Sequence, residues 1–126
     1  MDDFQGWVTG NVATAVRHRV AASGLHVADF RVACTRRRRA KNEEQRETTS
    51  FLGVRCFGTL ADNVASCVAL GDAVVVVGRL EVEENTKDGQ RYRDMVLLAA
   101  GVGPNLALGT TTFRRSVTGT RPAQAA

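Results

Sequence analysis

The stretch from Ser50 to Leu80 (SFLGVRCFGTLADNVASCVALGDAVVVVGRL) constrains the fold most, because its hydrophobic pattern changes period twice. Residues 51–57 alternate along the chain, which is typical of a β-strand. Apolar residues then recur at helical spacing from 60 to 68, until Gly71-Asp72 ends the pattern. The β-branched run at 73–77 predicts a further strand. The stretch therefore predicts a strand, a helix and a second strand.

The two faces of the strand at residues 51–57 differ in chemistry. Its inward face is expected to consist of Leu52, Val54 and Cys56. Its outward face holds Phe51 and Phe57 on either side of Arg55. Two aromatic rings beside a guanidinium suit the stacking of unpaired bases with phosphate pairing next to them. Burial of this face by another subunit would explain the same residues, because Phe is favoured in any strand, so the strand alone leaves both interpretations open.

Positive charge gathers in one part of the chain. The 126 residues, enough for one modest domain, carry a net charge of +4 and a pI of about 9.5. Residues 31–55 hold eight basic residues (seven Arg and one Lys) against three Glu, so this segment exceeds the net charge of the whole chain. Charge runs are commonly only solvated, but four consecutive arginines between two predicted strands favour an anionic partner such as nucleic acid.

The rest of the chain supplies the remaining strands. Residues 4–12 predict the first strand and residues 25–35 the second, whose core face would be Ala28, Phe30, Val32 and Cys34. The charged segment 36–49 is expected to be an extended hairpin loop leading to the third strand. After the helix, the strand that begins at Ala73 turns at Lys87-Asp88-Gly89 and returns over 92–100.

The order of three strands, a helix and two strands predicts an all-β fold, a five-stranded OB-fold barrel with one helix between strands three and four. Such barrels bind oligonucleotides on the face of strands two and three and on nearby loops, where the aromatic row and the arginine loop both fall. The candidate DNA-binding residues are Phe51, Arg55, Phe57, Arg31, Arg36, Arg37, Arg38, Arg39 and Lys41. We expect residues 1–109 to form the binding domain and 110–126 a short flexible tail.

No catalytic or metal-binding motif stands out in the sequence. His18 and His26 have no carboxylate or cysteine at a spacing that suggests a triad or a metal site. The three cysteines lie within strand or helix patterns and lack metal-ligand spacing. No apolar run is long enough to span a membrane, and no secretory signal is present. We therefore expect a cytoplasmic protein that is not an enzyme and uses no metal or cofactor.

Several segments together resemble the bacterial single-stranded DNA-binding proteins, and among them the short actinobacterial type. In the first strand T-G-N-V (residues 9–12) matches the family's V-G-N-[LV]. In the third, F-L-G-V-R-C-F-G-T-L-A (51–61) matches W-[HFY]-x-[VC]-x-x-[FW]-[GN]-x-L-A. The G-D to G-R-L segment (71–80) and the D-G segment (88–96) also match. The likeness covers about residues 4 to 109.

This resemblance implies an OB-fold homotetramer that binds single-stranded DNA without sequence preference. Its role would be to protect DNA in replication, recombination or repair, which implies a location at the nucleoid. Phe51 falls where the family usually has a stacking Trp, and Phe57 falls on a stacking aromatic of the same strand.

The chain also departs from the family pattern. A second Trp, near the end of strand two, is replaced here by Arg38 or a neighbour, and a third falls near Asn85. Fewer stacking platforms predict weaker and more salt-sensitive binding. The last residues, RPAQAA, lack the acidic tip that recruits other proteins in the family, so recruitment by that route is not expected. The one Trp, Trp7, is expected in the core or at a subunit interface.

Two functions from different classes remain at this stage. The first is a sequence-independent binder of single-stranded DNA, with RNA left open because nothing here reads a 2′-hydroxyl. The second is an oligomeric protein-interaction paralogue with weak or lost DNA binding. The arginine loop and the phenylalanine row favour the first, whereas the missing tryptophans favour the second.

Overall fold

The computed structural model describes residues 5–39 and 45–116, with the side chains of 36–39 and 45–47 excepted. The described strands and helix follow in the order β1 (Gln5–Val12), β2 (Arg17–Val20), β3 (His26–Arg39), β4 (Gln45–Phe57), α1 (Thr59–Cys67), β5 (Ala73–Lys87) and β6 (Gln90–Pro104). These residues form no helix long and apolar enough to cross a bilayer.

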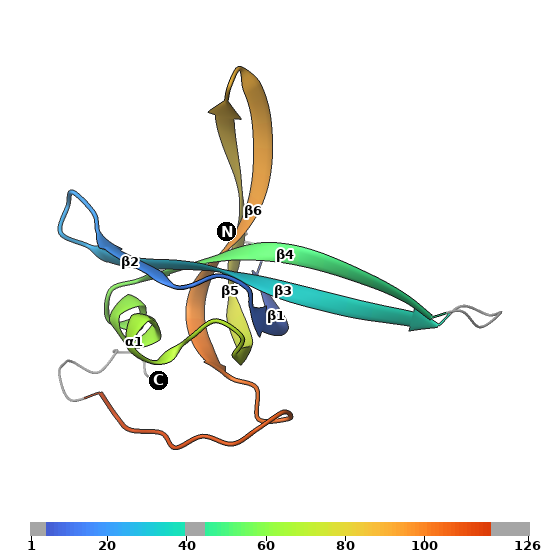
Figure 1. Cartoon of the computed structure of the whole chain (residues 1–126). Coiled ribbons are helices and arrows are strands. Elements are labelled where there is room, and N and C mark those ends of the chain that lie inside the picture. The colour runs from blue at the N-terminus through green and yellow to red at the C-terminus, as the bar shows by residue number, and fades with distance from the viewer. Residues whose placement is uncertain (1–4, 40–44, 117–126) are drawn as a thin grey trace.

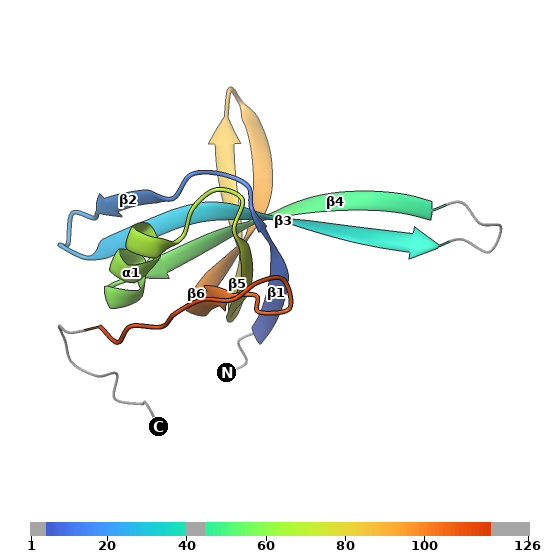
Figure 2. The ribbon, with the colours of Figure 1, turned by 60° about the horizontal axis from the view of Figure 1, so that its bottom comes forward.

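Five of the strands close into a barrel. β1 pairs antiparallel with β5 from Gln5 to Asn11, and its end also pairs with β3 through Asn11 and Val12. β3 pairs with β4, β4 runs parallel to β6, and β6 pairs with β5, which completes the ring. The predicted OB-fold barrel, with one helix between its third and fourth strands, is therefore confirmed (Figures 1 and 2).

The additional strand β2 lies outside this ring. It is four residues long, is exposed throughout, and pairs only with the start of β3 among the described strands. β2 is the next strand after β1 in the chain, so it extends the first strand of the fold and is not a sixth strand of the barrel.

The barrel interior is small and aliphatic. Buried side chains alternate along β3 and β4, as period-2 patterning requires: Ala28, Phe30 and Val32 in β3, Val54 and Cys56 in β4. Val74 and Val76 of β5 and Leu97 of β6 complete the cluster. Burial raises the pKa of the Cys56 thiol to about 11, so this cysteine acts as a small apolar core residue.

Helix α1 closes one end of the barrel with Ala61 and Val64 buried against β3 and β4. The helix begins after Gly58, whose φ of 69° favours glycine, and no side chain caps it. The N–H of Gly58 donates to the carbonyl of His26, so the start of the helix is tied to the start of β3. α1 ends at Cys67, four residues before the expected stop at Gly71.

Two long hairpins project from the barrel in different directions (Figures 1 and 2). One is the outer part of β3 and β4, here called the β3–β4 arm (residues 35–39 and 45–49); the other is the outer part of β5 and β6, the β5–β6 arm (residues 81–96). The expectation of a loop over 36–49 was wrong for its described residues, since pairing continues to Arg39 opposite Gln45. Antiparallel hydrogen bonding between β3 and β4 keeps this charged sequence in strand conformation, although its residues have low β-propensity.

Candidate nucleic-acid interface

The predicted aromatic row lies on the outer surface of the barrel. Val54 and Cys56 of β4 point into the core, so their neighbours point outward. Phe51 is 57% exposed and Phe57 is 38% exposed, which is unusual for phenylalanine in a folded domain. Arg55 lies between them on the same face. The sequence-based placement of these three side chains on one outward face is therefore confirmed.

Arg31 joins this face from the neighbouring strand. β3 pairs with β4 so that Arg31 lies opposite Gly53, between the partners of Phe51 and Arg55. Its side chain is exposed, and its backbone N–H donates to Thr14 Oγ1 at 3.0 Å. Gly53 offers no side chain to cover it. Within residues 5–39 and 45–116, the guanidinium of Arg31 has no ion-pair partner.

Arg55, in contrast, is already bonded. Its Nε donates to Asp29 Oδ1 at 2.8 Å and its Nη1 to Glu83 Oε2 at 2.6 Å. Asp29 also accepts from Arg19. The hydrogen bond to Asp29, and then that to Glu83, raise the pKa of Arg55 against the opposing effect of its partial burial. The positive charges of Arg19 and Arg55 are balanced by the two carboxylates, so the net charge in the middle of the face is close to zero.

The β3–β4 arm carries the four consecutive arginines. The backbone of Arg36 to Arg39 continues β3, opposite residues 45–48 of β4. Lys41, the one lysine among the candidates, lies outside the described residues. The arm leaves the barrel beside the aromatic row, because Phe51 and the arm are parts of one strand. The pairing of β3 with β4 thus places the backbone of the arginine segment on the strand next to the one that carries the phenylalanine row.

The β5–β6 arm adds an aromatic side chain that the sequence analysis did not single out. Tyr92 is 46% exposed and pairs with Asn85, the position near which a family Trp was noted as missing. Glu83, two residues from Asn85 on the same face, contacts Arg55 of the β4 row. Tyr92 therefore lies on the same continuous sheet surface as Phe51 and Phe57.

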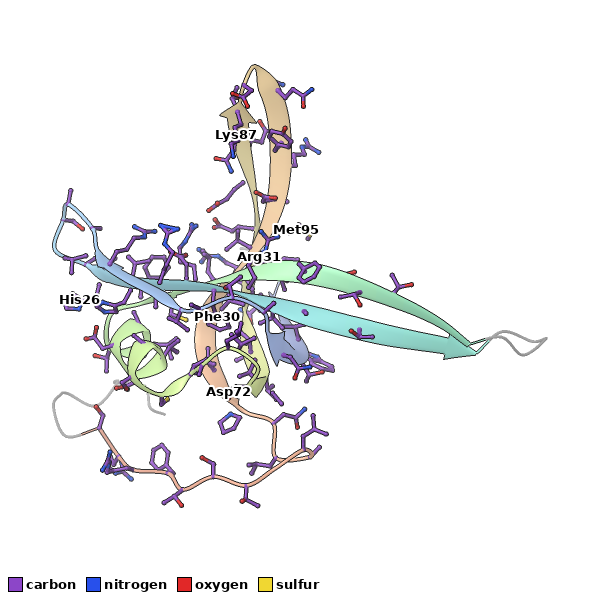
Figure 3. All side chains as sticks on the ribbon, in the orientation of Figure 1. His26, Phe30, Arg31, Asp72, Lys87 and Met95 are labelled. Carbon is purple, nitrogen blue, oxygen red and sulfur yellow. The ribbon has the colours of Figure 1, made fainter. Side chains whose placement is uncertain are left out.

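This tyrosine could have been found from the sequence. The turn at Asp88 (φ 53°) and Gly89 (φ 80°) is a two-residue hairpin turn, which fixes the register of the strands beside it. Counting back from Lys87 opposite Gln90 places Asn85 opposite Tyr92. Figure 3 labels Lys87 near the tip of this arm and Met95 near its base.

Trp7 is not a core residue, contrary to one of the two placements expected for it. Its side chain is 72% exposed, and it lies opposite Val77 of β5, which is itself 44% exposed. Val8 and Val12 are the residues of β1 that contact the core, so the alternation of the strand turns Trp7 outward. The subunit-interface placement stays a prediction.

Comparison with known proteins agrees with this geometry. Residues 4–103 match the model of the single-strand binding protein family. The chain is 42% identical over 110 residues to the single-stranded DNA-binding protein 2 of Streptomyces avermitilis, covering 86% of this chain and 69% of that protein. It is 40% identical over 118 residues to the single-stranded DNA-binding protein 1 of Streptomyces coelicolor, covering 92% and 75% respectively.

Comparison with solved structures also finds single-stranded DNA-binding proteins. The small single-stranded DNA-binding protein from Streptomyces coelicolor superposes with a TM-score of 0.74 at 35% identity, over 86% of this chain and all of that one. The second single-stranded DNA-binding protein of Mycobacterium smegmatis superposes with a TM-score of 0.70 at 28% identity, over 90% of this chain and all of that one.

Proposed function

This chain belongs to the single-strand binding protein family, and from that membership we propose that it binds and protects single-stranded DNA without reading its sequence. The observation that carries the proposal is the exposed row of aromatic rings on the outer face of β3 and β4, beside Arg31, which has no ion-pair partner among the described residues. A base has a π-face whatever its identity, so stacking on such rings tolerates any sequence.

The stacking residues of the proposed interface are Phe51, Phe57 and Tyr92. Each exposes more than a third of its surface, and the three belong to one continuous sheet face. Each stacked base is worth about 1–3 kcal/mol. Tyr92 supplies an aromatic ring close to the position where a Trp platform was missing, so the chain loses fewer platforms than its tryptophan count implies.

The phosphate-binding residues of the proposal are Arg31, the four arginines of the β3–β4 arm (Arg36, Arg37, Arg38 and Arg39) and Lys41, which follows them in the sequence. Exposed cations beside a stacking surface follow the backbone of a single strand and make affinity depend on salt. Arg55 stays within the proposed interface. Because its guanidinium is already bonded to Asp29 and Glu83, its contribution to phosphate binding is expected to be smaller than that of Arg31.

The finer parts of the proposal follow from the family resemblance. Residues 1–109 would form the binding domain and 110–126 a tail. Binding would serve replication, recombination or repair at the nucleoid. The chain would assemble as a homotetramer, and the exposed pair of Trp7 and Val77 is apolar surface that a neighbouring subunit would cover.

The test is a fluorescence-anisotropy titration with labelled oligo-dT and the matching RNA oligomer. Phe51→Ala is expected to weaken binding by about 1–3 kcal/mol, the value of one stacked base. Phe113→Ala is the matched control, because Phe113 is 82% exposed but lies in the segment after β6, away from the barrel face.

Equal losses of binding free energy in Phe51→Ala and Phe113→Ala would contradict the stacking role of Phe51. Absence of wild-type binding at low salt would overturn the function itself and leave a protein-interaction role. Tighter binding of the RNA oligomer would move the proposal from DNA to RNA.

A further inference from the structure

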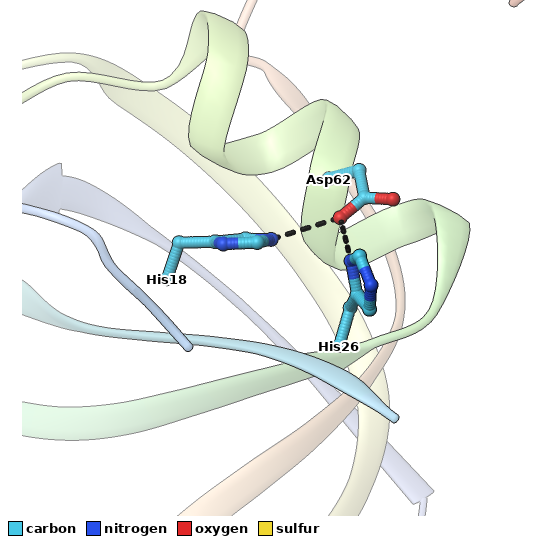
Figure 4. Close-up of side chains that lie close together, drawn as sticks. All are labelled: His18, His26 and Asp62. Carbon is cyan, nitrogen blue, oxygen red and sulfur yellow. Dashed lines mark hydrogen bonds and ion pairs between the residues drawn. The ribbon is translucent and has the colours of Figure 1, made fainter. Parts of the chain in front are cut away.

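The side chains of two histidines and an aspartate that are far apart in the sequence lie together between helix α1 and the β2–β3 hairpin. His18 comes from β2, His26 is the first residue of β3, and Asp62 is in the first turn of α1. His18 Nε2 and His26 Nδ1 each lie 2.8 Å from the same oxygen, Asp62 Oδ1 (Figure 4). Sequence spacing could not reveal this group, since Asp62 lies 44 and 36 residues away from the histidines.

The backbone holds these three residues in place. β2 pairs with β3 so that His18 lies opposite Ala28 and Val20 opposite His26, which makes the two histidines diagonal neighbours on one face. Helix α1 packs over β3 and β2, and its start is bonded to the carbonyl of His26. The group is therefore built by three elements that are fixed relative to one another.

The arrangement has the geometry of a metal site. One ligand atom from each residue lies within 4.8 Å of the other two. In a tetrahedral zinc site, with zinc to nitrogen or oxygen distances of about 2.0–2.2 Å, ligand atoms lie about 3.3 Å apart. The two 2.8 Å contacts would have to lengthen by roughly 0.5 Å to admit the ion. The imidazole rings, 5.4 Å apart and inclined at 80°, approach the carboxylate from different directions.

The protons of the group can be accounted for. In the hydrogen-bonded state, His18 Nε2–H and His26 Nδ1–H both donate to Asp62, and these bonds lower the pKa of the carboxyl group, which keeps it ionised. A metal ion needs the lone pairs of the same two nitrogens. Each neutral imidazole therefore changes tautomer through solvent, so that His18 carries its proton on Nδ1 and His26 on Nε2.

We propose that His18 Nε2, His26 Nδ1 and Asp62 Oδ1 bind a zinc ion, with water as the fourth ligand. Imidazole and carboxylate are ligands that zinc accepts, and two histidines with one carboxylate leave the fourth position open. All three side chains are between 34% and 50% exposed, so water and the metal can reach them. The inference does not rest on DNA binding, because it concerns the helix side of the β2–β3 hairpin.

The metal would join helix α1 to the β2–β3 hairpin. Two exposed side-chain hydrogen bonds now make that connection, together with the backbone bond from Gly58 to His26. An ion that binds only the folded arrangement stabilises it by mass action, so the melting temperature should rise with zinc concentration.

The experiment uses the full chain without a histidine tag and with Cys67→Ser in every sample, because Cys67 is an exposed thiol that could bind zinc by itself. Zinc chloride is titrated by isothermal calorimetry, and the histidine nitrogens are followed by long-range ¹H–¹⁵N NMR. We expect one zinc per chain, with the metal-bound shift on Nε2 of His18 and on Nδ1 of His26.

Two variants keep hydrogen bonding but remove good ligands. His18→Gln retains a side-chain N–H donor, and Asp62→Asn retains a carbonyl acceptor. Each should raise the zinc Kd by at least tenfold, the lower end of what losing even an outer-shell partner costs (about 10–100-fold). The control is Asp94→Asn, an exposed carboxylate on β6, which should leave Kd unchanged.

Three outcomes would overturn the proposal. One is zinc binding that H18Q and D62N leave unaffected. Another is a metal-bound shift on a nitrogen other than the two named. The third is no saturable binding up to millimolar zinc, which would make the group a hydrogen-bonded connection between helix and hairpin only. Loss of oligo-dT binding has no bearing on any of these readouts, so the two proposals fail separately.

Discussion

The two hairpin arms leave the same barrel but differ in what they carry. The sequence from residue 36 to 49, which includes the strands of the β3–β4 arm, has six basic and three acidic residues, a net charge of +3. From residue 81 to 94 the β5–β6 arm has three basic and five acidic residues, a net charge of −2, together with the exposed Tyr92. One arm is thus suited to phosphates, and the other offers a ring to a base. Within the two arms, the net positive charge lies on one and the exposed aromatic ring on the other.

The largest expected effect concerns the base of the β5–β6 arm. A methyl group on Gly78 would meet the backbone of Leu98 and Ala99, at the irregularity between Val77 and Gly78. Because backbone cannot move aside as a side chain can, Gly78→Ala should destabilise the fold by about 1–3 kcal/mol or more. Urea unfolding followed by circular dichroism measures this.

Gly101→Ala is the matched control for that substitution. It lies opposite Val77, and its added methyl group would make only an ordinary contact of 3.6 Å with the Val77 side chain. Equal losses of stability in the two variants would show that close backbone approach at Gly78 is not the cause.

The second prediction separates the arms by their salt dependence. Each phosphate contact on a single strand contributes about −0.7 to the slope of log K against log salt concentration. Changing Arg36–Arg39 to Ala should therefore reduce the slope by up to roughly 3. Changing Arg91 and Arg93 in the other arm should reduce it by no more than about 1.4, and by less because Glu84 pairs with Arg93. Equal reductions for the two arms would contradict the division of charge.

The third prediction concerns Tyr92 as a stacking ring. Tyr92→Ala should weaken oligo-dT binding by about 1–3 kcal/mol at constant salt slope, whereas Tyr92→Phe should retain affinity because the ring remains. Val82→Ala serves as the control, since Val82 is 57% exposed on the opposite face of the same arm. A change in salt slope for Tyr92→Ala would indicate that the arm contributes charge rather than stacking.

The smallest effect concerns the contact between the barrel face of β4 and the base of the β5–β6 arm. Arg55 of β4 donates to Glu83 of β5 with both side chains about one-quarter to one-third exposed (27% and 32%). A double-mutant cycle with Arg55→Met and Glu83→Gln should give a coupling energy of about 1 kcal/mol or less, because solvent screens a pair of this exposure. Coupling of several kcal/mol would mean that the base of the β5–β6 arm and the barrel face of β4 act as one rigid unit.

The barrel was predictable because two periods in the sequence are unambiguous. Alternation over 51–57 placed Phe51, Arg55 and Phe57 on one outward face, and the helical spacing after it gave α1. The β3–β4 arm was not predictable in the same way. Arg and Glu have little preference for strands, so the extension of β3 and β4 depends on hydrogen bonding to a partner strand and not on residue type.

The contacts of the site depend on register, which one sequence does not reveal. Asp29 and Glu83 bond to Arg55 only because three strands align at those positions, and Asp62 meets His18 and His26 only after α1 has packed. Tyr92 is the exception, because the Asp88-Gly89 turn specifies its partner. Trp7 was expected in the core or at a subunit interface. Its alternation with Val8 already indicated the face of β1 that points away from the core.

The way the barrel closes has a kinetic consequence. β1 completes the ring by pairing with β5, so Gln5 must find Arg79 across most of the chain. Contacts between residues so far apart in sequence cost loop-closure entropy before they yield stability, so folding should be slow, on the millisecond-to-second scale of other barrels. Until β1 pairs with β5, the unpaired edges of these two strands can form hydrogen bonds with the strands of a second chain. Crowding of nascent chains or a high expression level then favours aggregation over folding.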